Sequence, residues 1–331
     1  MKQGVKMKKL VAVVVPFLML AGSTWACDIH GETGIVEENS LNIPAGRKSL
    51  NGMTEAVFLE QIEKVSKFYT SAVEERGATL KVRKLWDDGT VNAYAKQVKP
   101  GEMDSDNNRN ETDKTIFEVN MFGGLARHET ITPDGFALVV CHELGHHLAG
   151  APRKLDFLGN LRWASNEGQA DYWGTMKCLR KVLESEAKTA TFLEKQAYDK
   201  EAYEACREAY GTNEKEVALC TRTSMAGKSL ANLFNSLRSI TTPVAFTTPD
   251  ANVVAKTFHS HPQPQCRLDT YFQGSLCTIS HTVDVDHDNP FLGVCTRRDG
   301  DSKGIRPLCW WNPSEYDNDN KTDETPVVVV Q

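Results

Sequence analysis

One segment of the sequence combines residue types and a spacing that can hold a catalytic metal ion. It is His142-Glu143-Leu144-Gly145-His146, with two histidines four positions apart and an acid beside the first. In a helix, residues four apart lie one above the other on one face, so both imidazoles can reach one tetrahedral zinc ion. Glu143 is then placed to reach a water molecule held by the metal, and not the metal itself. The competing interpretation is a histidine-rich helix end that faces solvent.

A second acidic motif begins twenty residues after His146 and can complete such a site. Glu167 can be the third protein ligand, and Asp171 lies one turn later on the same helix face. There Asp171 can accept the N–H of a ligand histidine, which fixes the tautomer of that imidazole. Three protein ligands leave the fourth position of one zinc ion for water, as in catalytic sites, although cobalt and manganese accept the same ligands. Without the first motif, a solvated acidic first turn would be the default interpretation.

Two helices must position these groups. The pattern over residues 132–148 predicts a helix in which Thr132 caps the first turn and Pro133 takes the first helical position. A second helix is expected over residues 165–187, with Glu167 in its first turn.

The other patterns predict an α+β fold that is mainly helical, with a small antiparallel sheet. Asp87-Asp88-Gly89 has the turn chemistry of a β-hairpin between two alternating segments. The predicted elements are a helix over residues 54–76, strands over 79–86, 90–98 and 115–122, and helices over 191–210 and 213–239.

The beginning of the chain indicates export. Residues 1–26 carry four lysines and no acid, followed by an apolar run from Leu10 to Gly22 and small residues. This is the pattern of a secretory signal peptide, and the run is too short to span a bilayer. We therefore expect a periplasmic or secreted protein. A lipid anchor at Cys27, directly after the expected cleavage point, is the less favoured alternative.

Composition and charge limit the function classes. The 331 residues are 40% hydrophobic and 25% charged, as in ordinary globular proteins. Without the predicted leader, 34 basic residues stand against 44 acidic ones, a net charge of −10 that disfavours nucleic acid as a partner. No second apolar stretch predicts a transmembrane segment. We expect a polar lead-in over residues 27–53, one domain with the metal site over 54–280, and a loop-rich extension over 281–331 packed on it.

Nine cysteines in an exported chain predict disulfides, and no C-x-x-C pair predicts a structural zinc cluster. The eight beyond Cys27 allow 105 complete pairings. The spacing favours Cys206 with Cys220 and Cys295 with Cys309, without excluding other pairings. Cys141, next to a predicted ligand, is expected to be buried or disulfide-bonded rather than bound to metal.

Together these motifs resemble a family, the gluzincin zinc metallopeptidases that include the HtpX-like, BepA-like and CAAX prenyl proteases. The resemblance spans residues 91–268 in family order. Its segments are Val91-Asn92-Ala93-Tyr94-Ala95, similar to the family's "NAfa" segment, Gly123-Gly124 before the metal helix, Glu167 with Ala170-Asp171, similar to its E-x-x-A-D motif, and His261-Pro262 followed by Arg267-Leu268.

The resemblance implies a zincin-like domain that hydrolyses peptide bonds. Zinc would activate a water molecule, from which Glu143 takes the proton and passes it to the departing amine. The tetrahedral oxyanion needs a second stabiliser, for which His261 is the first choice, with Arg267 and Tyr172 as alternates. The competing interpretation of His261 is a structural or gating role.

The family also implies that an edge strand bordering the active site, here residues 115–122, binds an extended or unfolded polypeptide substrate by β-augmentation. The leading hypothesis is therefore an exported zinc metalloendopeptidase. The alternative is a metal-stabilised binding or chaperone-like module that does not cleave, and a metal-free structural protein is the third. Glu143 favours the enzyme, because a binding module needs no general base.

Overall fold

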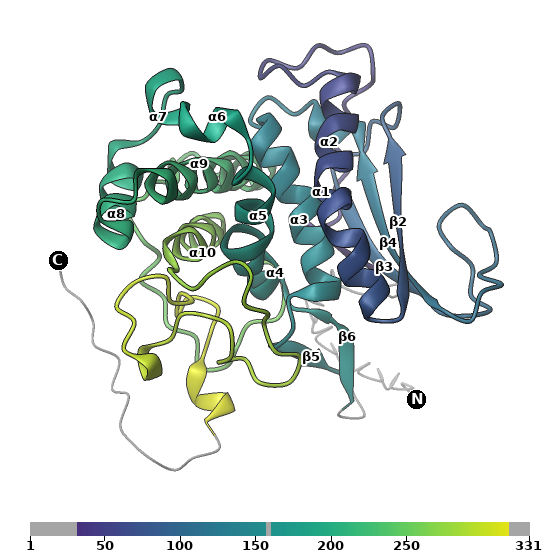
Figure 1. The fold of residues 1–331 in the computed structure, drawn as a ribbon. Helices are drawn as coiled ribbons and strands as arrows, with labels where there is room; N and C mark the ends of the chain where they lie inside the picture. The colour runs from purple at the N-terminus through teal and green to yellow at the C-terminus, as the bar shows by residue number, and fades with distance from the viewer. Residues whose placement is uncertain (1–31, 157–159, 318–331) are drawn as a thin grey trace, which may run out of the picture.

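The protein is described from a computed structural model that covers residues 32–156 and 160–317, and its helices pack together on one side of a sheet (Figure 1). α1 (Glu55–Glu75) and α3 (Pro133–Leu148) lie against the sheet, and a second group of helices packs on the other side of α3. The predicted signal peptide and Cys27 lie outside the described residues. Within the described ranges, none of the helices combines the length and hydropathy needed to cross a bilayer. The predicted α+β class is confirmed.

The four-stranded sheet is mixed, with the strand order β1-β3-β4-β2. Its strands are β1 (Glu32–Gly34), β2 (Ala78–Leu85), β3 (Ala93–Val98) and β4 (Thr115–Phe122). β2 pairs parallel with β4, while β3 pairs antiparallel with both β4 and β1. The prediction of a wholly antiparallel sheet is therefore wrong. The prediction of an edge strand over residues 115–122 is also wrong, because β4 has a hydrogen-bonded neighbour on each side.

The predicted β-hairpin is wrong as well, because β4 lies between β2 and β3. The Asp87-Asp88-Gly89 turn instead contacts α2 (Gly123–Ala126), the short helix that directly follows β4. The Gly124 N–H donates to the Asp88 carbonyl at 2.9 Å. A Cβ on Gly124 would lie 1.9 Å from the Gly89 carbonyl oxygen, so this approach requires glycine. The turn thus binds the chain that leads toward α3.

The predicted helix over residues 165–187 is largely confirmed. α4 (Glu167–Trp173) continues through a π-helical segment (Gly174–Leu179) into α5 (Arg180–Leu183), and a short hairpin of β5 (Arg153–Leu155) and β6 (Leu161–Ser165) precedes it. The helix expected over residues 191–210 is interrupted at 196–199. The other helices are α6 (Ala187–Ala190), α7 (Phe192–Lys195), α8 (Lys200–Tyr210), α9 (Glu214–Leu237) and α10 (Pro264–Leu276).

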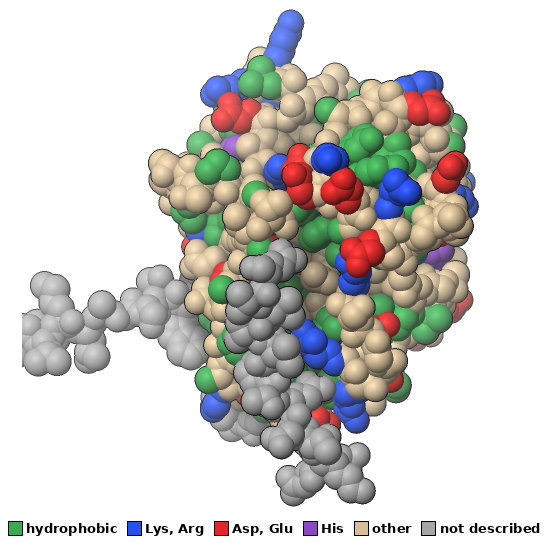
Figure 2. Space-filling view, turned by 90° about the vertical axis from the view of Figure 1, so that its left-hand side faces the viewer, with side chains coloured by type: hydrophobic (Ala, Val, Ile, Leu, Met, Phe, Trp, Pro, Cys, Tyr) green, Lys and Arg blue, Asp and Glu red, His purple; other side chains and the backbone are tan. Residues whose placement is uncertain are grey.

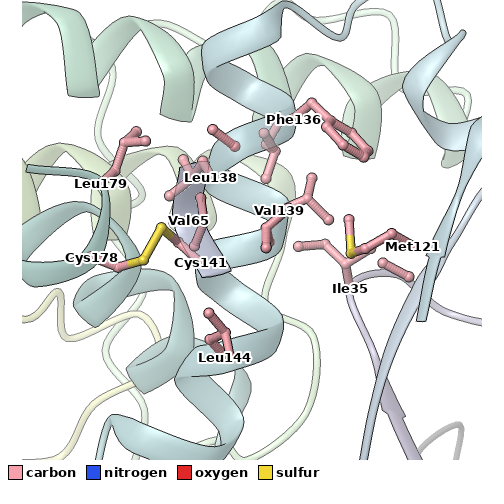
Figure 3. Close-up of a cluster of buried hydrophobic side chains, with 14 of the residues drawn as sticks. Ile35, Val65, Met121, Phe136, Leu138, Val139, Cys141, Leu144, Cys178 and Leu179 are labelled. Carbon is pink, nitrogen blue, oxygen red and sulfur yellow. A yellow bond between two sulfur atoms is a disulfide. The ribbon is translucent and has the colours of Figure 1, made fainter. Parts of the chain in front are cut away.

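The largest hydrophobic core lies between α3, α1 and the sheet. Figure 3 shows side chains of α3 on both sides of the helix, with Leu138 toward the π-helical segment and Val139 toward the sheet. The segment expected as a lead-in also belongs to this core, because Ile35, Ile43 and Met53 are buried in it. α3, which carries His142 and His146, is therefore held on two faces by packing.

The described residues form four disulfides, which indicates folding in an oxidising compartment. They are Cys141–Cys178, Cys206–Cys220, Cys266–Cys309 and Cys277–Cys295. The predicted bond between α8 and α9, Cys206–Cys220, is confirmed. The predicted Cys295–Cys309 bond is wrong, because each of these cysteines is bonded instead to a cysteine near one end of α10. The described part of the 281–331 extension is thereby attached to α10.

The face of the molecule in Figure 2 carries acidic and basic side chains next to one another, without a patch of one sign. Ion pairs at the surface of the molecule include Lys215 with Glu184 at 3.0 Å and Lys303 with Glu208 at 2.6 Å. Nucleic-acid binding uses basic residues gathered in one stripe. This face has no such arrangement in the described residues.

Candidate metal centre

α3 begins as its sequence predicts. The Thr132 hydroxyl accepts a hydrogen bond from the Gly135 N–H at 3.1 Å, and Pro133 occupies the first helical position. The helix then runs unbroken through His142 and His146, which share one face. Their rings are perpendicular, with centroids 4.7 Å apart, and their Nε2 atoms are 3.1 Å apart.

α4 brings the acidic residue to the same place. Its cap is Asn166, whose side chain accepts from the Gln169 N–H at 2.8 Å, and Glu167 stands in the first turn. The two helices approach closely because Gly145 faces Ala170, where a Cβ on Gly145 would lie 3.1 Å from the Ala170 Cα. Small residues at this crossing let the α4 carboxylate reach the histidines of α3.

The three predicted ligands form one buried cluster. Glu167 Oε2 lies 3.3 Å from His142 Nε2, and Glu167 Oε1 lies 3.7 Å from His146 Nε2. One ligand atom from each residue lies within 4.8 Å of the other two, and all three side chains are almost completely buried. The predicted convergence of these residues is therefore confirmed in the structure.

Neighbouring groups orient both imidazoles toward the centre of the cluster. His146 Nδ1 lies 2.9 Å from the Ser165 carbonyl oxygen, which can only accept, so this nitrogen carries the proton. His142 Nδ1 lies 2.7 Å from Asp171 Oδ1, as predicted for the carboxylate that fixes the histidine tautomer. Both Nε2 atoms then face Glu167 and each other, so they can bind one metal ion once His142 has lost its proton.

The donor set fits zinc. Two imidazole nitrogens and one carboxylate are the ligands of many catalytic zinc sites. Buried polar atoms of Glu143 also support a functional site, because no described residue gives a hydrogen bond to either of its carboxylate oxygens. Buried polar groups are rarely left unpaired without a functional reason. A second cluster, Asp250 with Cys266 and Cys309, does not fit, because its two sulfurs form a disulfide.

The electrostatics of the cluster favour a cation. Burial works against ionisation of Glu167, but His261, His146 and His142 outweigh it and hold the pKa of Glu167 well below its usual range. Burial also opposes charge on His142, yet Asp171 raises the pKa of His142 to about 9. Burial raises the pKa of Glu143 to about 8. A divalent ion bound here would displace the proton of His142, so binding would release protons.

Arg267 anchors Asp171 from the other side. Its Nε and Nη2 atoms donate to the two oxygens of Asp171, each at 2.7 Å, and the Tyr271 hydroxyl donates to the same carboxylate. Burial would raise the pKa of Asp171, but Arg267 and His142 lower it overall. Arg267, predicted as an alternate oxyanion stabiliser, thus lies beside the cluster, with Nη2 4.0 Å from Glu167 Oε2.

His261 and Tyr172, the other two residues predicted to stabilise the oxyanion, lie in different places. His261 joins the cluster, with Nε2 3.4 Å from Glu167 Oε2. Tyr172 does not: its hydroxyl donates to the Gly304 carbonyl, and Arg306 lies over its ring, among the C-terminal loops. His147 also points away from the cluster, stacked against Phe117.

Sequence patterns gave no sign of two residues at the cluster. The Thr33 hydroxyl donates to Glu167 Oε1 at 2.9 Å, and the Gly34 carbonyl oxygen lies 2.7 Å from His261 Nε2. Tyr271 had a weak signal, since it follows Arg267 by one helical turn. A small open cleft is lined by Val36 and Arg238 together with His261 and Arg267.

No protein-family model matches the chain, and neither the curated proteins nor the solved structures provide a match. The resemblance to known zinc sites therefore rests on the buried His142, His146 and Glu167 cluster and its H-E-x-x-H…E spacing.

Proposed function

We propose that the protein is an exported zinc-dependent metalloendopeptidase of the gluzincin type that hydrolyses extended or unfolded polypeptides. The observation that carries this proposal is the convergence of His142, His146 and Glu167 beside a buried, unpaired Glu143 carboxylate. A purely structural metal site needs a fourth protein ligand and no neighbouring base. The four disulfides support an exported location.

The side chains divide the chemistry among them. His142, His146 and Glu167 would hold the zinc ion, which when bound supplies a Lewis acid for a carbonyl group and makes water more acidic. Glu143 takes a proton from the attacking water and returns it to the amine nitrogen that leaves. His261 is placed to donate to the carbonyl oxygen of the bond being cut, as its 2.7 Å contact with a peptide carbonyl supports.

An extended polypeptide suits this site because β1, the edge strand paired with β3, lies against it: the Thr33 hydroxyl donates to Glu167 Oε1 at 2.9 Å. The Ala93 carbonyl at the start of β3 accepts the Ile35 N–H at 3.1 Å, so an extended segment of the chain itself is paired here. Pairing of this kind binds a peptide through its backbone and tolerates many side chains.

Digestion of unfolded casein by the zinc-loaded protein, with and without EDTA, tests the proposal. We expect cleavage that EDTA abolishes and that Glu143→Gln lacks although it still binds one zinc ion. Glu118→Gln is a matched control, because Glu118 is equally buried but bonds to the Ser105 N–H outside the cluster. Zinc binding without cleavage by the wild type would favour the non-cleaving, chaperone-like module.

A further inference from the structure

A short segment of the chain lies extended along β3, directly beside the metal cluster. β1 pairs antiparallel with β3, with Thr33 opposite Ala95 and Gly34 opposite Tyr94. The chain continues in the same line, since the Ile35 N–H donates to the Ala93 carbonyl at 3.1 Å. The segment from residue 33 to 36 is therefore bound along β3 by its main chain.

The Asn92 side chain, just before β3, also binds the segment. Its Oδ1 accepts from the Val36 N–H at 3.3 Å, and its Nδ2 donates to the Val36 carbonyl at 3.2 Å. An amide side chain that bonds both main-chain groups of one residue recognises an extended backbone whatever side chain that residue carries. This contact also fixes the register of the segment relative to β3.

The opposite side of the segment contacts the residues of the candidate centre. The Thr33 hydroxyl donates to Glu167, His261 Nε2 lies 2.7 Å from the Gly34 carbonyl oxygen, and Arg267 Nη1 donates to the Ile35 carbonyl at 2.5 Å. Three successive residues are thus each held by one group of the site. A bound peptide substrate would be fixed in the same manner.

The side chains of the segment indicate which residues such a groove accepts. Gly34 is tightly enclosed: a Cβ there would lie 2.9 Å from the Tyr94 ring and 3.1 Å from the Ala93 carbonyl oxygen. Ile35 is completely buried in the core cluster that includes Val139, three residues before His142, and Met121 of β4 (Figure 3). The groove therefore fits a residue without a side chain followed by a branched aliphatic residue.

We infer that the segment from residue 33 to 36 occupies the substrate groove, with the Gly34–Ile35 peptide bond in the position of the bond to be cut. This inference rests on the proposed function and deepens it. The chain is then inactive while the segment is in place. Its preferred substrates are polypeptides with glycine before a branched aliphatic residue.

The chemistry is a simple hydrolysis. One water molecule adds across the bond, the Gly34 carbonyl carbon gains its oxygen, and the C–N bond to Ile35 breaks. Glu143 transfers one water proton to the Ile35 nitrogen, and the second proton passes from the new carboxyl group to the same nitrogen, which leaves a carboxylate on Gly34 and an ammonium group on Ile35. The first substrate of the zinc-loaded chain is then its own segment.

Peptide binding tests the occupancy without cleavage. The probe is a fluorescent peptide with the sequence of residues 32–38, and the protein is the full chain carrying Glu143→Gln. Gly34→Leu should displace the segment and tighten probe binding by about ten-fold or more, because apparent affinity rises with the fraction of free grooves. Gly46→Leu is the control, since a Cβ there meets nothing within 4 Å.

Equal probe affinity in the Gly34→Leu and Gly46→Leu proteins would overturn the inference. Gly34→Ala, with one methyl group against Tyr94, replaces the leucine variant if that variant does not fold. Hydrogen exchange gives a second readout: the Ile35 and Val36 amides should be protected in the parent and exchange faster in the Gly34 variants.

Intact mass and N-terminal sequencing of the zinc-loaded chain test the register. We expect a new terminus at Ile35, absent in Glu143→Gln. Casein cleavage with the Gly34–Ile35 bond intact would overturn the inference and leave the proposed peptidase standing. Probe binding that depends on Gly34, without any casein cleavage, would support the occupied groove and remove the peptidase.

Discussion

Asp171→Asn tests how the metal ligands are positioned. The asparagine keeps the shape of the side chain but removes the charge that faces His142 and accepts two 2.7 Å bonds from Arg267. Loss of a carboxylate that orients a metal-binding histidine costs about 10–100-fold in metal affinity. We therefore expect zinc to bind Asp171→Asn with a dissociation constant raised by about 10–100-fold, or roughly 1.4–2.8 kcal/mol.

The same substitution leaves a buried guanidinium without its anion. Arg267 is 1% exposed, and Glu167, the next carboxylate, is 4.0 Å away. Breaking a buried ion pair by removing one partner costs about 3–5 kcal/mol of unfolding free energy. Guanidinium denaturation in EDTA should show a loss of this size, while zinc affinity is measured by competition with a chromophoric chelator.

Asp134→Asn is the matched control. Asp134 also accepts two 2.7 Å bonds from one arginine, Arg222, but lies outside the metal cluster. Arg222 keeps Glu186 as a partner at 2.7 Å, so the loss of unfolding free energy should be smaller and zinc affinity unchanged. A positioning role of Asp171 is excluded if Asp171→Asn binds zinc within two-fold of wild type, or if both variants weaken zinc binding equally.

Three further predictions concern the scaffold and the metal. Alanine at both Cys141 and Cys178 removes the disulfide that closes a loop of 37 residues. This change should lower the unfolding free energy by about 4 kcal/mol in guanidinium titrations. Gly168→Ala places a Cβ 2.3 Å from the Trp310 ring, so the first turn of α4 must shift; we expect a loss of about 1–3 kcal/mol and weaker zinc binding by chelator competition. Zinc at one hundred times its dissociation constant should stabilise the wild type by about 2.7 kcal/mol, measured as a Tm increase that EDTA reverses.

Each of these has its own control. Removal of the Cys206–Cys220 bond, which closes 14 residues, should cost about 3 kcal/mol without changing zinc affinity. Gly46→Ala should be neutral, because a Cβ there has open space. Unchanged zinc binding in Gly168→Ala would disprove the positioning role of the α4 turn, and a Tm insensitive to zinc would contradict a site formed only in the folded state.

The part of the site that sequence predicts is the part built from local geometry. His142 and His146 share a helix face by spacing alone, and Glu167 lies in the first turn of a helix capped by its neighbour. The role of Arg267 could not be predicted, because its bond to Asp171 joins residues 96 positions apart. The strand β1 could not be predicted either, because its three residues are too few to show a strand pattern.

The errors in the sheet have one physical cause. An alternating pattern identifies a strand but not its partner, and Asp87-Asp88-Gly89 suggested the nearest one. The structure pairs β2 with β4 in parallel, which requires a longer connection, and the turn contacts α2. The disulfides show the same limit, since Cys295 and Cys309 each bond to a partner near α10 rather than to each other.

The most direct test of the account is anomalous scattering at the zinc absorption edge from crystals of the zinc-loaded Glu143→Gln protein. We expect one peak, about 2.0–2.2 Å from His142 Nε2, His146 Nε2 and a Glu167 carboxylate oxygen. No peak among these three residues, or zinc bound elsewhere while they remain as described, would contradict it.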